Sequence, residues 1–197
     1  AVFAIDYLSG AIRSASASSV ELITPWGRLS LSRFATLQRV IWHRGGCVSV
    51  QVKICGITRE IDALAAANAG ADAIGLIFWS GSKRRVSLEK AADICAALPP
   101  LVTVTALMVD PTASEVEAVL EALPINLIQW HGKEGPEFCE QWRMPYVKAL
   151  PSSACGELES VMANYPSARG FLLDAVANGQ FGGTGHPFDW DVVPAAR

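Results

Sequence analysis

The sequence lacks the patterns that mark several classes of protein. It has no CxxC pair and no zinc-ligand spacing, so we expect neither a disulfide framework nor a metal site, and reduced thiols indicate a cytoplasmic protein. No apolar run reaches the roughly 18 residues of a membrane span. The longest runs, such as Leu101–Val109, have about the length of a strand. A net charge of −3 provides no overall basic field that would favour nucleic acid or an anionic membrane.

What is present is the composition of a folded domain. Of the 197 residues, 51% are hydrophobic and 18% are charged, which is enough apolar material for one sizeable core. The odd number of cysteines also favours free thiols. The five are Cys47, Cys55, Cys95, Cys139 and Cys155.

The N-terminal segment differs from the rest. The first fifty residues hold five arginines, no lysine and two acids, a balance of 5 − 2 = +3, whereas the remainder holds 11 basic and 17 acidic residues, a balance of 11 − 17 = −6. We interpret residues 1–49 as an atypical extension, non-native or poorly ordered, and residues 50–197 as the main domain. Val20–Thr24 and Arg28–Ser32 predict a hairpin within the extension. Asp6 and Glu21 argue against an organelle transit peptide.

From residue 50 onward, strands and helices alternate. Short apolar stretches start near residues 51, 72, 101, 126, 146 and 170, and a segment of helical character follows each of the first five. The predicted strands are Val50–Cys55, Asp72–Trp79, Leu101–Val109, Asn126–Trp130, Tyr146–Leu150 and Gly170–Asp174. The predicted helices are Arg59–Ala69 with Thr58 as N-cap and Gly70 after its end, one from Leu88 to before Pro99, one from a Thr112/Glu115 capping box to Ala122, one starting at Pro136, and Cys155–Tyr165.

This alternation predicts right-handed βαβ units and a parallel sheet covered by helices. Two architectures fit, a doubly wound open sheet and a (β/α)₈ barrel. Neither GxGxxG nor GxxxxGK[ST] follows the first strand, which disfavours the nucleotide-binding open sheets. Polar residues at the ends of several strands suit a barrel, because its active site is assembled from the loops after its strands. Periodicity alone leaves both architectures open.

Two side chains at strand ends are candidates for acid–base chemistry. Lys53 and Cys55 share one face of the first strand, and Cys55 ends it beside Gly56. A thiol there can act as a base if a positive group stabilises its thiolate, or it is a small buried hydrophobe. Asp174 ends the apolar strand Gly170–Asp174 as a functional carboxyl, an N-cap or a loop ligand. In a barrel, Cys55 and Asp174 would face each other across the mouth.

Three further motifs are candidates for substrate binding. The loop Ser82–Arg85 can bind a carboxylate or phosphate, or it is a solvated turn. Gln129 and His131 share a face at the end of the fourth strand. The glycine-rich Gly182–Gly185 offers backbone N–H groups to an anion. Cys95 and Cys139, on predicted helices, are expected to be small buried hydrophobes.

Taken together, these motifs resemble one family. Five of them occur in one order: Lys53-Ile-Cys-Gly-Ile-Thr58, Gly75-Leu-Ile-Phe78 with Ser82-x-Arg84, Gln129-Trp-His-Gly132, Leu173-Asp174 with Gly182-Gly-Thr-Gly185, and Phe188-Asp-Trp190. The segment from about residue 50 to 197 closely resembles phosphoribosylanthranilate isomerase of tryptophan biosynthesis. The resemblance implies a (β/α)₈ TIM barrel that needs no cofactor and no metal. Its substrate would be the phosphosugar N-(5′-phosphoribosyl)anthranilate, which undergoes an Amadori rearrangement.

The resemblance also implies roles for individual residues. Asp174 would be the general acid that protonates the furanose ring oxygen, and Cys55 the general base that removes the C2′ proton. Arg84 would hold the anthranilate carboxylate, and Lys53, Gln129, His131, Gly182 and Gly183 would contribute to substrate binding. The family is cytoplasmic, and we expect a monomer or homodimer, with fusion to a neighbouring tryptophan-pathway enzyme as a further arrangement.

The chain departs from the family pattern in two ways. Where the family commonly has Ser-Pro-Arg, this chain has Ser82-Lys83-Arg84, and where the family has Gln-Leu-His-Gly, it has Gln129-Trp130-His131-Gly132. Only about six βα units are recognisable; strands seven and eight, whose loops bind the phosphate in the family, are absent. We therefore expect an incomplete barrel with an open sheet edge, and this chain as given is expected to have very low activity. The alternatives are an inactive barrel fragment, a non-catalytic interaction module, or another sugar-phosphate isomerase.

Overall fold

The computed structural model describes residues 51–151 and 159–174 in full, and the backbone alone for residue 158 and for the strands within residues 1–50. Along the main domain, six strands alternate with five helices. In chain order they are β6 (Gly46–Cys55), α1 (Glu60–Asn68), β7 (Ala73–Ile77), α2 (Leu88–Ala97), β8 (Thr103–Met108), α3 (Ala113–Ala122), β9 (Leu127–Trp130), α4 (Pro136–Glu140), β10 (Tyr146–Pro151), α5 (Leu158–Ala163) and β11 (Gly170–Asp174).

The helix ends agree with the sequence signals at most positions. The Thr112/Glu115 capping box is present at α3, Pro136 opens α4, and Gly70 follows α1 with a φ of 93°. The prediction that Thr58 caps α1 is wrong, because the N-cap is Arg59, without a side-chain cap. The N–H groups of Gly56 and Ile57 both donate to the Gly75 carbonyl, so the chain stays against β7 and the helix begins one residue later.

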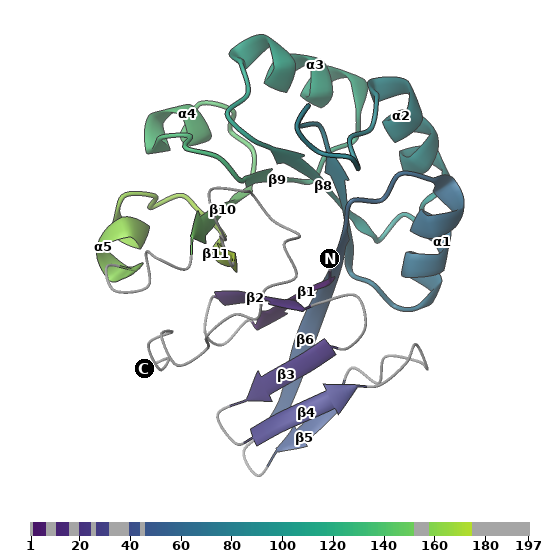
Figure 1. Cartoon of the computed structure of the whole chain (residues 1–197), viewed down its shortest axis with the longest axis vertical. Helices are drawn as coiled ribbons and strands as arrows, with labels where there is room; N and C mark the ends of the chain where they lie inside the picture. The colour runs from purple at the N-terminus through teal and green to yellow at the C-terminus, as the bar shows by residue number, and fades with distance from the viewer. Residues whose placement is uncertain are drawn as a thin grey trace.

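The six strands form a curled parallel sheet with two apolar sides. Parallel pairs run without a break from β6 through β7, β8, β9 and β10 to β11. One side packs against the helices through residues such as Ile74, Leu76 and Ile128. The other side faces inward through residues such as Ile77 and Leu172. Figure 1 shows α1 to α5 in an arc outside the strands, which confirms an incomplete (β/α)₈ barrel of six units.

The expectation of an open sheet edge is wrong. β1 (Val2–Asp6) pairs antiparallel with β6, and β2 (Ala11–Ala15) pairs parallel with β11, while β1 and β2 pair with each other. Together with the six strands they close a ring in the order β6-β7-β8-β9-β10-β11-β2-β1. A strand needs only backbone N–H and C=O groups to cap a sheet edge, so two strands without crossover helices can complete the ring.

The remaining N-terminal strands extend away from this ring. β3 (Val20–Thr24) and β4 (Gly27–Leu31) form an antiparallel two-stranded sheet, which confirms the predicted hairpin with its second strand one residue earlier. β5 (Val40–His43) pairs antiparallel with the first half of β6. In Figure 1 these strands lie at the opposite end of the molecule from α3. β6 is therefore ten residues long and runs from this extension into the barrel.

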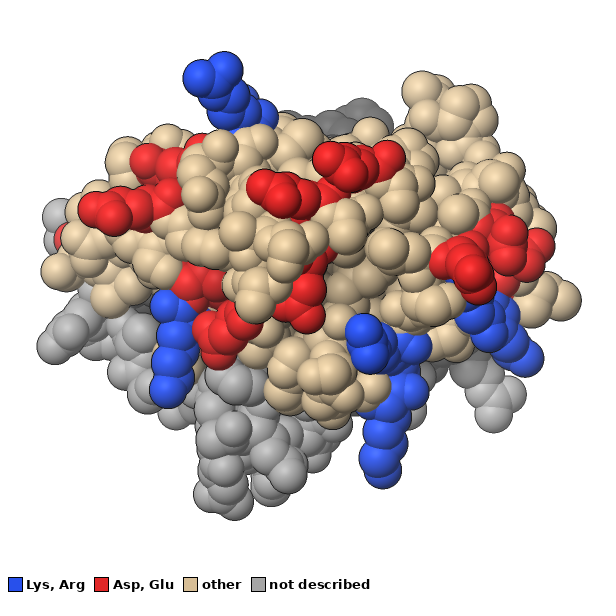
Figure 2. Space-filling view, turned by 90° about the horizontal axis from the view of Figure 1, so that it is seen from above, with Lys and Arg blue, Asp and Glu red and all other residues tan. Residues whose placement is uncertain are grey.

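The outer surface is acidic over the helices. Figure 2 shows Asp and Glu side chains gathered across the face seen from above, with Lys and Arg nearer its rim. The exposed glutamates of α3, Glu115, Glu117 and Glu121, belong to the acidic side chains of the helix layer. Within the part of the chain that the structure describes, no helix has both the length and the apolar character to cross a membrane.

Candidate active site

A chain of buried polar side chains crosses the inside of the barrel. Lys53 Nζ donates to Gln129 Oε1, Gln129 Nε2 lies 2.7 Å from His131 Nδ1, and His131 Nε2 lies 3.0 Å from Asp174 Oδ2. Lys53 and Gln129 are 2% and 0% exposed, and His131 and Asp174 are each 7% exposed. Side chains from three strands that are far apart in sequence are thus brought together on the inner face, at or near the carboxyl ends of β6, β9 and β11, where barrel active sites form.

Cys55 joins this chain through Lys53. The two side chains share a hydrogen bond, and both point into the barrel, as the alternation along β6 predicts. Burial lowers the pKa of Lys53, and the neighbouring Cys55 opposes that change by favouring the ammonium form. Lys53 is therefore the candidate for a positive group beside the Cys55 thiol.

One glycine makes room for the Cys55 thiol and another for the Arg84 side chain. A Cβ at Gly75 on β7 would lie 2.8 Å from Cys55 Sγ, so only glycine leaves space for the sulfur there. Gly56 has a φ of 83°, and a Cβ on it would overlap the Arg84 guanidinium. These contacts give a physical reason for glycine at two positions of the motifs singled out in the sequence.

Arg84 is anchored at the mouth beside Cys55. Its Nη1 donates to the Cys55 carbonyl at 2.8 Å, and its backbone N–H donates to Ser82 Oγ at 3.1 Å. The guanidinium is half-buried, whereas Lys83 is exposed. The Ser82 turn is therefore formed with lysine in the position where proline is common in the family. A guanidinium held against the Cys55 carbonyl can bind a carboxylate.

Sequence reasoning missed a buried ion pair beneath the loop after β9. Lys148 Nζ lies 2.8 Å from Glu134 Oε2 and donates to the Gly132 carbonyl at 2.6 Å. The Glu134 carboxylate also accepts from the backbone N–H groups of Gly132 and Asp110. This cluster holds the loop that directly follows His131. A lysine within the apolar run Tyr146–Leu150 was the signal that could have revealed it.

The other described thiols differ from Cys55 in their surroundings. Burial raises the pKa of Cys95 on α2, and it raises the pKa of Cys139 on α4 to about 12. Thiols with raised pKa values stay protonated near neutral pH and are poor bases. Cys95 and Cys139 therefore fit the structural role expected for them.

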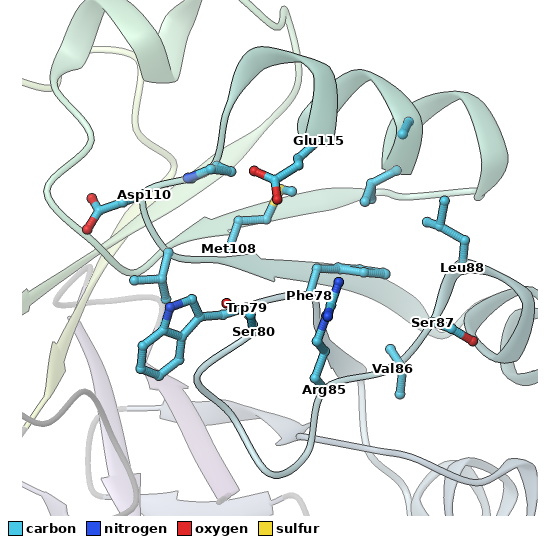
Figure 3. A pocket seen from close by; sticks show the side chains of 14 residues that line it. Phe78, Trp79, Ser80, Arg85, Val86, Ser87, Leu88, Met108, Asp110 and Glu115 are labelled. Carbon is cyan, nitrogen blue, oxygen red and sulfur yellow. The ribbon is translucent and has the colours of Figure 1, made fainter.

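A separate cavity of about 340 Å³ lies between the loop after β7 and the start of α3. Figure 3 shows Arg85 and Glu115 on its wall together with Phe78 and Met108. Met108 belongs to the core between sheet and helices, and neither Cys55 nor Asp174 lines this cavity. The candidate acid–base residues therefore belong to the inner polar side chains and not to the lining of this cavity.

Two expectations concern groups that the chain would bind. Among residues 51–151 and 159–174, the side chains of His, Cys, Asp and Glu form no group of three or more suited to a metal ion. Gly182 and Gly183, expected to contribute N–H groups, lie outside the described residues, as does the Phe188-Asp-Trp190 motif.

The chain is similar to a well-defined set of proteins. Residues 52–197 match the family model described as N-(5′-phosphoribosyl)anthranilate (PRA) isomerase. A relative from Alcanivorax borkumensis, named N-(5′-phosphoribosyl)anthranilate isomerase, is 49% identical over 144 residues, which cover 73% of this chain and 66% of the relative. The chain therefore spans about two thirds of the length of this relative.

Solved structures agree with the sequence matches. The crystal structure of phosphoribosyl anthranilate isomerase from Thermotoga maritima superposes with a TM-score of 0.63 at 36% identity, covering 71% of this chain and 68% of that one. A second structure of such an isomerase, in complex with reduced 1-(o-carboxyphenylamino)-1-deoxyribulose 5-phosphate, has a TM-score of 0.58 at 36% identity and covers 63% and 64% of the two chains.

Proposed function

The chain belongs to the N-(5′-phosphoribosyl)anthranilate isomerase family, and on that premise we propose that it converts N-(5′-phosphoribosyl)anthranilate into 1-(2-carboxyphenylamino)-1-deoxyribulose 5-phosphate. The reaction is an intramolecular redox step, in which C1′ is reduced and C2′ is oxidised, so it consumes no external electron donor. It requires an acid, a base and a clamp that holds the substrate between them.

Asp174 and Cys55 are proposed as the acid and the base. Asp174 donates a proton to the furanose ring oxygen, and the C1′–O bond breaks as the nitrogen lone pair forms the C1′=N double bond of a Schiff base. Cys55, as thiolate, then removes the C2′ proton, and the released electron pair forms the C1′=C2′ bond of an enolamine. Protonation at C1′ and loss of the C2′ hydroxyl proton give the ketone.

Arg84 is proposed to bind the anthranilate carboxylate. Its anchor on the Cys55 carbonyl fixes the guanidinium next to the base, so a substrate held there by its carboxylate would present its sugar to the barrel mouth. Lys53 and Gln129 are almost fully buried and hydrogen-bonded to each other. Their burial favours support of Cys55 and His131 over direct contact with the substrate.

The observation that carries the proposal is the continuous polar chain inside the barrel. Asp174 lies at one end of this chain and Lys53, the neighbour of Cys55, at the other, and Cys55 and Asp174 are both buried at carboxyl ends of strands, which supports their proposed roles. Buried carboxyl, imidazole and ammonium groups are costly unless they are paired, and a buried chain that links one of each through the Gln129 amide is typical of a catalytic site.

The test measures the conversion of N-(5′-phosphoribosyl)anthranilate by chromatography, with the enzyme in excess over the substrate. We expect conversion by the wild-type chain and a loss of at least about a hundredfold in rate for Cys55→Ser and for Asp174→Asn. Cys95→Ser is the matched control, since this half-buried thiol lies on α2, and it should retain the wild-type rate. Wild-type rates in both site variants would contradict the proposed roles.

Two further assays separate the alternatives. Rescue of a histidine auxotroph but not a tryptophan auxotroph would indicate a different sugar-phosphate isomerase. A cooperatively folded chain without turnover on either substrate would indicate a non-catalytic module, whereas aggregation would indicate an inactive fragment.

We also propose a cytoplasmic monomer or homodimer. The large exposed hydrophobic side chains of the described residues are Ile61 and Leu64 on α1 and Leu101 before β8, and they do not by themselves specify an obligate assembly. Sedimentation equilibrium of the purified chain distinguishes the two states, and fractionation of expressing cells tests the compartment.

A further inference from the structure

The buried chain from Lys53 to Asp174 has a direction, which follows from the donors and acceptors that each group possesses. An ammonium has only donors, so Lys53 must face the oxygen of the Gln129 amide. The amide nitrogen of Gln129 is then turned toward His131, 2.7 Å from Nδ1. An amide NH₂ is also only a donor, so Nδ1 must offer its lone pair.

This geometry leaves one neutral form of His131. With Nδ1 as acceptor, the ring proton sits on Nε2, and the Nε2–H donates to Asp174 Oδ2 at 3.0 Å. A proton on Nδ1 would bring two N–H donors face to face at 2.7 Å in a site that is almost closed to solvent. The unmade hydrogen bonds in such an arrangement are penalised in a buried site.

The same geometry decides how two protons are shared between His131 and Asp174. They can form an imidazolium beside a carboxylate, or a neutral imidazole beside a carboxylic acid, with the same total number of protons. Only the second arrangement keeps a proton on Asp174. The Gln129 donor opposes the first, because an imidazolium carries a proton on Nδ1. Since His131 already donates to Oδ2, the acid proton of Asp174 belongs on Oδ1.

We propose that Gln129, oriented by Lys53, is a positioning residue that holds His131 as the neutral Nε2–H tautomer and thereby places the catalytic proton of Asp174 on Oδ1. This inference rests on the proposed function for the role of Asp174 as an acid. The orientation of the amide and the tautomer of His131 follow from the hydrogen bonds alone.

The test combines ¹⁵N NMR of the histidine side chains with kinetics of Gln129→Glu. In the wild-type chain near pH 7, we expect His131 to show an unprotonated Nδ1 and a protonated Nε2. In Gln129→Glu, the new carboxylate can accept from both Lys53 and Nδ1–H, so both nitrogens of His131 should be protonated. We expect kcat to fall at least about tenfold, with KM changed less than about threefold, because Gln129 is fully buried.

The control variant is Gln141→Glu, which makes the same change of charge at an exposed glutamine after α4 and should keep the wild-type spectrum and kcat. A wild-type His131 protonated on Nδ1 overturns the inference, even if Gln129→Glu does not fold. A folded Gln129→Glu variant with wild-type kcat, or with lower kcat but unchanged His131 signals, overturns it as well. Because the NMR result needs no turnover, absence of wild-type activity would contradict the proposed function and leave the tautomer to be decided separately.

Discussion

At the scale of single residues, the position of the Cys55 sulfur depends on Gly75. A methyl group at Gly75 would lie 2.8 Å from Sγ, well inside van der Waals contact, so Gly75→Ala should push the thiol out of place. We expect kcat to fall by about a hundredfold, since a displacement of about 1 Å has effects of that size. Overpacking should lower the free energy of unfolding by about 1–3 kcal/mol.

Gly135→Ala is the matched control for Gly75→Ala. A Cβ at Gly135, before α4, meets nothing within 4 Å. Steady-state kinetics and urea unfolding of both variants make the comparison. Equal kcat values for the two variants would show that the sulfur tolerates a methyl group on β7.

Cys139 should shape the alkaline stability of the fold. Burial raises its pKa from 9.0 to about 12, so between these values the unfolded chain loses the thiol proton while the folded chain keeps it. The free energy of unfolding therefore decreases as the pH rises through this range. Urea midpoints of wild type and Cys139→Ala, measured from pH 7 to 11, should converge or cross above pH 9. Parallel curves would contradict the prediction.

At the scale of elements, the loop after β9 depends on the Glu134–Lys148 pair. Both side chains are almost fully buried, so removing one partner leaves an uncompensated charge. Glu134→Gln and Lys148→Met should each lower the free energy of unfolding by about 3–5 kcal/mol, and the double variant should be less destabilised than the sum of the two. A double-mutant cycle by urea unfolding measures this. Additive effects would contradict the predicted coupling. As the control, a cycle on the exposed Arg59–Asp62 pair should show no coupling energy.

The elements themselves were largely predictable, because their signals are local. The six strands, the Thr112/Glu115 capping box and Pro136 at the start of α4 could be read from neighbouring residues. The missed N-cap of α1 depends on a bond from Gly56 to Gly75, nineteen positions away by their numbering. The Glu134–Lys148 pair escaped prediction for the same reason, since it joins two different units of the barrel.

The site was predictable as a set of residues but not as a network. Alternation along β6 placed Lys53 and Cys55 on one face, strand-end positions singled out Asp174 and His131, and the resemblance added their expected roles. The order of hydrogen bonds from Lys53 through Gln129 to His131 arises only when β6, β9 and β11 curl around a common interior. The sequence therefore indicated which chemistry is available, and the fold determines how its protons are arranged.

At the scale of the whole molecule, the N-terminal strands complete the barrel. The segment was interpreted as a poorly ordered or non-native extension, and that domain assignment stays a prediction. Its strand pairing gives it a structural role, because β1 and β2 cover the two edges that β6 and β11 would otherwise expose. Ring closure removes the unpaired backbone groups through which open sheets associate.

This role can be tested by proline substitution. Ala4 in β1 pairs with Arg13 on one side and Val52 on the other, so Ala4→Pro removes a backbone donor between two ladders. Ser30 in β4 pairs with Glu21 in the separate β3–β4 sheet, and Ser30→Pro is the matched control. If β1 closes the barrel, Ala4→Pro should lower the free energy of unfolding by about 1–3 kcal/mol and speed amide exchange in β6 and β11. Ser30→Pro should leave the amides of both strands protected. Unchanged exchange in Ala4→Pro would mean that the six parallel strands keep their edges protected without β1 and β2, and the barrel core would then be independent of these two strands.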